Sequence, residues 1–245
     1  SIVKPTAERG DYTRVAPVYE VSDKGRGKTP ATAAMHLALA SELYGRGAYA
    51  EAQAEAERGL KADPASPDLH TLRAAIAAAR GDQATAGRHY QRAQALAPVA
   101  GAYANNYGTW LCGNGRAAES LGWFDAALAD PRYPTRADAL ANLGVCATRA
   151  GQPQRAELAW RQALALEPGH AAALGGLARA AYARGAYLEA RAFIQRRLAA
   201  GAPDAETLQL ASQIELKLGD TAASSRYLHQ LQTASPGAPP APRPP

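Results

Sequence analysis

The chain has 245 residues and a formal net charge of +5; hydrophobic residues make up 47% of it and aromatic residues 7%. No stretch approaches the roughly 18–20 apolar residues of a membrane-spanning helix. The arginines are scattered and form no basic run with interleaved aromatic residues, so the sequence predicts a solvated basic surface and no nucleic-acid partner.

The two ends of the chain lack helical periodicity. Residues 1–30 contain Gly, Pro, Lys, Asp and Ser, and we expect them to form an extended N-terminal tether with a short strand-like piece at Val15–Val21. Residues 236–245 are rich in proline, which cannot continue a helix, and are predicted to be a disordered tail. The domain proper is therefore expected at 31–235.

Glycines recur through this central region at a nearly constant spacing of 34, 34, 36, 34 and 34 residues. A period near 34 is typical of the tetratricopeptide repeat (TPR), a helix–turn–helix unit. The six glycines are Gly47, Gly81, Gly115, Gly151, Gly185 and Gly219. The sequence thus predicts an all-α fold, a right-handed TPR superhelical solenoid of about six repeats and 12 helices.

The repeat boundaries follow from this spacing. We expect the repeats at about 33–66, 67–100, 101–136, 137–170, 171–203 and 204–235. Within each repeat, small residues let neighbouring helices approach, and a large apolar residue fills the space between repeats, as Tyr90, Phe124, Trp160 and Ile194 do. A single helix pair cannot bury its apolar face alone, so neighbouring pairs must stack.

In such a stack the first helix of each repeat lines the concave side. Positions two, five, nine, twelve and thirteen of that helix are expected to face a protein-binding groove suited to a peptide with apolar anchors. The candidate groove residues are Leu37, Ser41, Tyr44, Thr71, Asn105, Thr109, Arg179 and Tyr182.

Signals for enzymatic chemistry are absent from the sequence. It has no glycine-rich phosphate loop, no nucleophile elbow, and no histidine spacing typical of a metal site. His36 and His70 fall at equivalent helix positions and are predicted to pack between paired helices. A carboxylate clamp around Asn106 is not expected, because no cation faces it. We therefore predict no catalytic residue, no metal and no cofactor.

Cys112 and Cys146 lie 34 residues apart, on the first helices of the third and fourth repeats. Adjacent helix axes about 8–10 Å apart allow a disulfide. Two buried thiols are an equally good interpretation from spacing alone, because cysteine also packs as a small hydrophobic residue.

The third and fourth repeats carry more specific motifs. They contain Asn105-Asn106-Tyr107-Gly108, Leu111-Cys112-Gly113, the exit Asp130-Pro131-x-Tyr133-Pro134 with two extra residues, and Asn142-Leu143-Gly144-x-Cys146. In these motifs the chain resembles the PilF/PilW family of type IV pilus biogenesis proteins. The resemblance extends over about residues 30–235, and Glu8-Arg9-Gly10 fits it too.

The resemblance implies a non-enzymatic pilotin, a lipoprotein on the periplasmic face of the outer membrane of a Gram-negative bacterium. Its partner would be the type IV pilus secretin subunit, whose outer-membrane localisation and multimer assembly it promotes. The first repeats would carry the secretin contact, and a periplasmic location favours the disulfide. The lipid-bearing N-terminal Cys of the family is absent from this sequence. Two alternatives are a general periplasmic TPR scaffold and a cytoplasmic TPR module that regulates an enzyme or a nucleic-acid complex.

Overall fold

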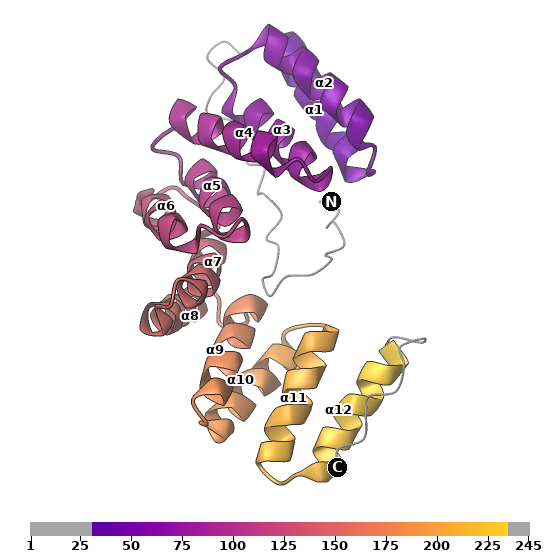
Figure 1. The fold of residues 1–245 in the computed structure, drawn as a ribbon, viewed down its shortest axis with the longest axis vertical. Coiled ribbons are helices and arrows are strands. Elements are labelled where there is room, and N and C mark those ends of the chain that lie inside the picture. Colours follow the sequence, from indigo (N-terminus) through magenta and orange to yellow (C-terminus); the bar gives the residue numbers. More distant parts are fainter. Residues whose placement is uncertain (1–30, 235–245) are drawn as a thin grey trace. The chain divides into compact units, whose positions relative to one another are not determined.

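The computed structural model describes residues 31–234, which form twelve α-helices joined by short turns (Figure 1). The helices are α1 Ala31–Gly45, α2 Tyr49–Ala62, α3 Pro67–Ala79, α4 Gln83–Leu96, α5 Gly101–Gly113, α6 Ala117–Ala129, α7 Arg136–Arg149, α8 Pro153–Leu166, α9 Ala171–Ala183, α10 Tyr187–Ala199, α11 Ala205–Lys217 and α12 Thr221–Ala234. The all-α architecture predicted from the glycine spacing is therefore confirmed. The expected tether at 1–30, with its strand-like piece, and the tail at 236–245 lie outside the described residues.

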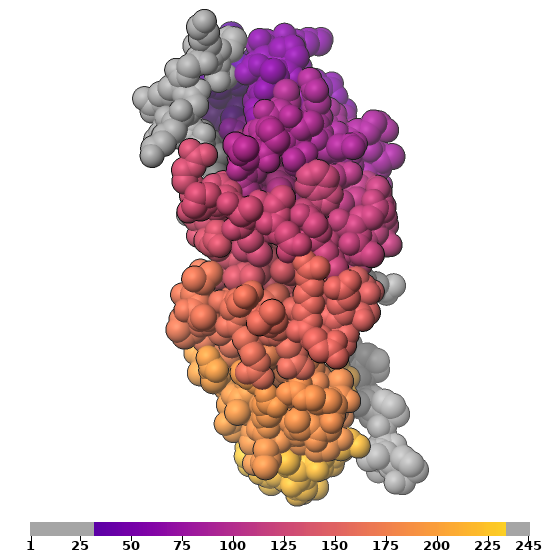
Figure 2. Space-filling model, turned by 90° about the vertical axis from the view of Figure 1, so that its left-hand side faces the viewer, coloured from indigo at the N-terminus to yellow at the C-terminus, as the bar shows by residue number. Residues whose placement is uncertain are grey.

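The helices fall into two compact units, divided between Gly151 and Gln152. In the first unit, α1 to α7 pack in chain order, and α3 contacts both α1 and α5 while α5 also contacts α7. In the second unit, α8 to α12 pack in order and α9 contacts α11. Within each unit, side chains fill the spaces that the ribbon drawing leaves between successive helices (Figure 2). Each unit is thus a stack in which neighbouring helix pairs supply one another's core.

The turn inside each helix pair depends on glycine. Gly47, Gly81 and the four other spaced glycines all have positive φ angles, between 74° and 84°. Side chains with a Cβ adopt this left-handed conformation only at a cost, so glycine ends the first helix and reverses the chain. In the first turn the amide of Ala48 then donates to the carbonyl of Leu43 at 2.9 Å.

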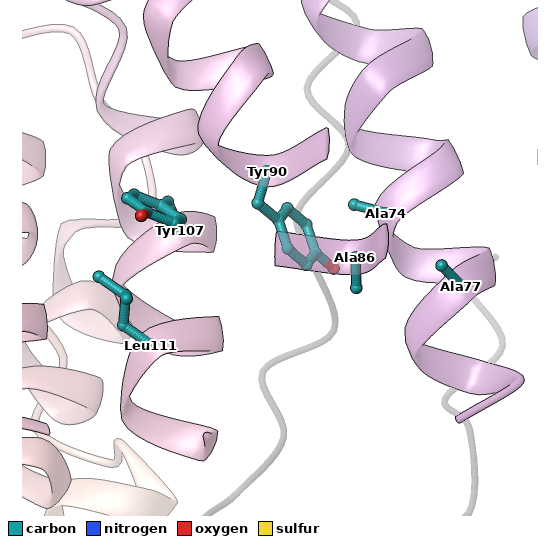
Figure 3. Close-up of a cluster of buried hydrophobic side chains, with 6 residues drawn as sticks. All are labelled: Ala74, Ala77, Ala86, Tyr90, Tyr107 and Leu111. Atoms are coloured by element: carbon teal, nitrogen blue, oxygen red, sulfur yellow. The ribbon is translucent and has the colours of Figure 1, made fainter. Parts of the chain in front are cut away.

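Small and large residues alternate where helices meet. At Ala74 on α3 and Ala86 on α4, both fully buried, a methyl group lets the paired helices approach closely. Figure 3 shows the Tyr90 ring of α4 turned toward Ala86 and Ala74, and Tyr107 and Leu111 of α5 complete the cluster. The large residues predicted to fill the inter-repeat spaces are all buried: Tyr90, Phe124, Trp160 and Ile194.

The two-residue insertion after α6 ties α6 to α5. The Asp130 carboxylate accepts a hydrogen bond from the amide of Gly101 at 2.9 Å, at the start of α5. It also accepts from the amide of Arg132 at 2.9 Å, which tightens the turn. Tyr133 is buried in a cluster with Ala104 of α5 and Ala139 of α7. The insertion therefore fills a space between three helices and caps one of them.

Candidate protein-binding surface

Three of the candidate binding residues lie on α1. Leu37 and Tyr44 are half-buried and pack against a cluster that contains Ala40 and Ala52. The Ser41 hydroxyl donates to the carbonyl of Leu37 at 2.8 Å, which leaves its oxygen as an acceptor. The Tyr44 ring lies 5.6 Å from the ring of Tyr49 on α2, centroid to centroid. This part of the surface is mostly apolar, with single polar groups.

The candidates on α3 and α5 are less accessible. Thr71 and Asn105 are buried, with 2% and 3% of their surfaces exposed. The Asn142 amide of α7 donates to Asn105 Oδ1 at 3.3 Å, so this residue links two helices. Thr109 is half-buried, and its hydroxyl donates to the carbonyl of Asn105 at 2.8 Å. Thr109 therefore offers surface to a partner, whereas Thr71 and Asn105 contribute mainly to the interior beneath it.

The candidates in the second unit lie on α9. Arg179 forms an exposed ion pair with Glu206 of α11 at 2.7 Å. The Tyr182 ring lies 5.5 Å from the ring of Tyr187 across the turn to α10, which matches the arrangement of Tyr44 and Tyr49 in the first unit. The same turn geometry thus presents a tyrosine pair in both units.

One acidic group stands out next to these candidates. Asp68 on α3 accepts a hydrogen bond from the Tyr103 hydroxyl of α5 at 2.8 Å. Burial raises the pKa of the Asp68 carboxyl above its ordinary value, because a charged carboxylate is poorly solvated there, while the hydrogen bond from Tyr103 acts in the opposite direction. Asp68 and Tyr103 therefore join adjacent repeats through one polar contact.

Sequence reasoning placed His36 and His70 between paired helices without identifying their partners. His36 Nδ1 lies 2.7 Å from the Glu55 carboxylate of α2, and His70 Nδ1 lies 2.9 Å from His89 Nδ1 of α4. Both pairs are separated by 19 residues, so the repeat itself was the signal that could have revealed them. Within residues 31–234, no three side chains that could bind a metal ion gather in one place.

The structure joins Cys112 of α5 and Cys146 of α7 in a disulfide, with their Cα atoms 5.8 Å apart. Both residues are buried, with 5% and 4% of their surfaces exposed. Of the two interpretations that spacing left open, the bonded pair is the arrangement in the structure. The bridge and the Asn105–Asn142 hydrogen bond hold the same two helices together.

Sequence reasoning missed the most exposed apolar side chains of α1. Met35 and Leu39 are 70% and 43% exposed and lie one helical turn apart. One repeat later, Leu69 of α3 occupies the position that corresponds to Met35, and Leu69 is buried. Leu69 packs closely onto Gly59 of α2, because a Cβ added to Gly59 would lie 2.7 Å from Leu69 Cδ2. The signal was the α1 sequence, which is apolar on nearly every face.

None of the helices within residues 31–234 has both the length and the apolar character needed to cross a bilayer. The described helices are 13 to 15 residues long and stack through small residues. Exposed apolar and tyrosine side chains of this kind are typical of surfaces that bind other polypeptides.

Comparison with known proteins agrees with this architecture. Tetratricopeptide-repeat models match residues 37–101 and 147–214. The crystal structure of PilW, described as a widely conserved type IV pilus biogenesis factor, matches this chain with a TM-score of 0.79 and a sequence identity of 32%. The match covers 85% of this chain and 96% of the PilW chain. The type IV pilus assembly protein PilF of Pseudomonas aeruginosa is 24% identical to this chain, over 88% of this chain and 84% of its own length. A solved structure of Pseudomonas aeruginosa PilF matches with a TM-score of 0.76 at 24% identity. That match covers 84% of this chain and 93% of the PilF chain.

Stacked helix pairs that recur every 34 to 36 residues define a TPR protein. The chain belongs to the PilF/PilW family of type IV pilus biogenesis TPR proteins.

Proposed function

We propose that this protein is a non-enzymatic pilotin that binds the type IV pilus secretin subunit and promotes its outer-membrane localisation and multimer assembly. The observation that carries the proposal is the 32% identity to PilW over 96% of that chain. The motifs at Asn105-Asn106-Tyr107-Gly108 and Asp130-Pro131-x-Tyr133-Pro134 support it, because in them the chain resembles the PilF/PilW family.

The first helix pair is the part of the surface best suited to the secretin contact. It combines exposed Met35 and Leu39 with half-buried Leu37 and Tyr44. Leu69, which corresponds to Met35 in the next repeat, is buried against α2. The face of α1 that carries Met35 therefore has the composition of a surface that packs against another helix. Apolar and aromatic anchors of this kind supply most of the binding free energy of protein interfaces. Thr109 would extend this contact within the first unit, while Arg179 and Tyr182 would form a separate contact on the second unit.

Deletion of the gene in its host tests the function directly. We expect the heat- and detergent-resistant secretin multimer to disappear from outer-membrane fractions, with secretin monomer accumulating or mislocalised. An intact multimer in a strain without pili would move the protein to a later step of pilus biogenesis. Unchanged multimer and unchanged pili would reject the pilotin role and favour a general periplasmic scaffold.

Substitutions test the surface. Met35→Asp and Tyr44→Ala should weaken secretin binding at least about tenfold, since each removes an apolar anchor. Leu37→Asp should act in the same direction, with circular dichroism showing whether the helices persist. The matched control is Leu158→Asp, because Leu158 is 58% exposed on α8 of the second unit. Equal affinities for all four variants would discard the assignment to the first helix pair.

The proposed location includes membrane attachment through a lipid on an N-terminal Cys that is not part of this sequence. One acyl chain binds membranes only marginally, so several chains would be needed for stable anchoring. Mass spectrometry of the protein isolated from its host outer membrane would show the acylated N-terminus, and an unmodified N-terminus in that fraction would contradict the anchoring.

A further inference from the structure

The first two repeats contain the same polar contact with different chemistry. His36 and Glu55 link α1 to α2, and their positions 34 residues later are His70 and His89, which link α3 to α4. The first pair joins an imidazole to a carboxylate, which accepts a hydrogen bond whether the imidazole is neutral or protonated. The second pair joins two imidazoles, which is favourable only while at least one of the facing nitrogen atoms lacks a proton.

The position of the protons in the second pair follows from its neighbours. His70 Nε2 lies 3.0 Å from the carbonyl oxygen of Pro64, and a carbonyl can only accept, so Nε2 carries a proton. In neutral His70 the Nδ1 atom is then an acceptor, and the Nδ1–H group of His89 donates to it at 2.9 Å. If both rings are doubly protonated, two N–H groups face each other and the contact is lost.

The surroundings oppose protonation of either ring. Burial, together with nearby His70, Arg73 and Arg88, lowers the pKa of His89 to about 4, whereas Glu57 acts in the opposite direction. Burial also lowers the pKa of His70 and Arg92 adds to this, while the Pro64 carbonyl and Asp63 oppose it. Arg73 is itself paired with Glu57 at 3.3 Å, so that carboxylate is shared.

We propose that the α3–α4 helix pair is an acid-sensitive joint and that the α1–α2 pair is its acid-tolerant counterpart. The two histidines of the joint lie in one contact between the helices, with a backbone carbonyl fixing one ring. His89 precedes Tyr90, whose ring packs between α3 and α5. Opening of the joint therefore exposes the contact between the second and third repeats first.

The direction of the effect follows from proton linkage. A histidine whose pKa is lowered in the folded state binds protons better once the joint opens. The stabilisation of the closed joint is therefore fully present above the ordinary histidine pKa of 6.5. It is lost as the pH falls from 6.5 toward the folded-state pKa of about 4. For a fully buried ring, this shift predicts that the equilibrium constant for closing the joint falls roughly 30-fold at pH 5. Because both rings are half-exposed, we expect about a three- to tenfold loss.

Hydrogen–deuterium exchange of the full chain at pH 7.5 and pH 5.0, corrected for intrinsic exchange rates, tests the proposal. The backbone amides of residues 68–96 should lose about three- to tenfold more protection at pH 5.0 than those of residues 31–62. Equal losses in the two helix pairs would overturn it. The readout needs no partner, so its result is independent of whether the protein binds the secretin.

Two reciprocal variants sharpen the test. His89→Glu copies the first pair into the second and should remove the extra acid sensitivity of α3 and α4. Glu55→His copies the second pair into the first and should make α1 and α2 acid-sensitive. Retention of acid sensitivity in His89→Glu, or acid tolerance in Glu55→His, would each contradict the proposal. Should one variant fail to fold, the other still decides.

Discussion

Two tryptophan rings pack directly onto helical glycines. Trp110 of α5 covers Gly87 of α4, and Trp160 of α8 covers Gly176 of α9. A Cβ added at either glycine would overlap ring carbon atoms. Glycine is a poor helix former, so its presence inside these helices reflects the close approach of the ring.

We therefore expect Gly87→Ala to lower the free energy of unfolding by about 1–3 kcal/mol, because overpacking outweighs the gain in helix propensity. Gly122 on α6 is the control: no atom lies within 4 Å of its added Cβ. Gly122→Ala should raise the free energy of unfolding by about 0.5–1 kcal/mol. Urea denaturation measures both, and a stabilising Gly87→Ala would show that the Trp110 ring moves aside easily.

At the scale of the element, the N-terminal caps of the first helices differ from repeat to repeat. The Ser66 hydroxyl accepts a hydrogen bond from the amide of Leu69 at 3.2 Å and so caps α3. The equivalent residue before α5 is Ala100, which has no side-chain cap. The Asp130 carboxylate takes that place by accepting a hydrogen bond from the amide of Gly101, 29 residues earlier in the chain. A local cap has thus been replaced by a long-range one.

Asp130→Ala should lower the free energy of unfolding by about 1 kcal/mol, which is typical of a lost helix cap. The backbone amides of Gly101 and Arg132 lower the pKa of Asp130 below its ordinary value of 3.8. The stabilisation is therefore present above pH 3.8 and disappears as the pH falls through the folded-state pKa. Urea titrations at pH 7 and pH 3 would measure it. Ala100→Ser in the Asp130→Ala background should restore part of the loss, and no rescue would argue against a capping role.

The disulfide acts on two elements, α5 and α7. The loop between Cys112 and Cys146 spans 34 residues, so the bridge should stabilise the fold by about 3–4 kcal/mol in the chain-entropy model. The double variant Cys112→Ala/Cys146→Ala should lose this amount in denaturant titrations under oxidising conditions, and reductant should affect only the wild type. Two free thiols in protein isolated from its host without reductant would contradict the bridge.

At the scale of the whole chain, the net charge of +5 is spread over both units, and many arginines are paired: Arg161 with Glu189, Arg179 with Glu206 and Arg191 with Glu215. Such pairs leave little concentrated field at the surface. The apolar side chains of α1 should therefore dominate partner binding.

Raising NaCl from about 50 to 500 mM should then change the dissociation constant of the proposed secretin complex by less than about threefold, because salt screens exposed charges and leaves apolar contacts intact. Isothermal titration calorimetry would measure it. A loss of affinity of tenfold or more would assign the contact to the arginines instead, as in nucleic-acid binding.

The sequence alone determined the repeat, the twelve helices and the residues at helix contacts. Gly47 and its equivalents must adopt positive φ, and a small residue is needed at the positions of Ala40, Ala74 and Ala178. Both requirements recur every 34 to 36 residues, so the residue types alone reveal the repeat. The motifs of the third and fourth repeats were equally readable, since they depart from the repeat at fixed positions.

Only the tertiary structure decided which candidate residues present a surface. Thr71 and Asn105 share the expected groove positions yet are buried, whereas Met35 on the outer face of α1 is exposed because no helix precedes it in the described stack. The pairing of Cys112 with Cys146 and of Asp130 with Gly101 also depends on how helices cross. Helix formation is governed by neighbours in sequence, but contacts between residues some 20 to 40 positions apart are set by packing, which a linear pattern does not encode.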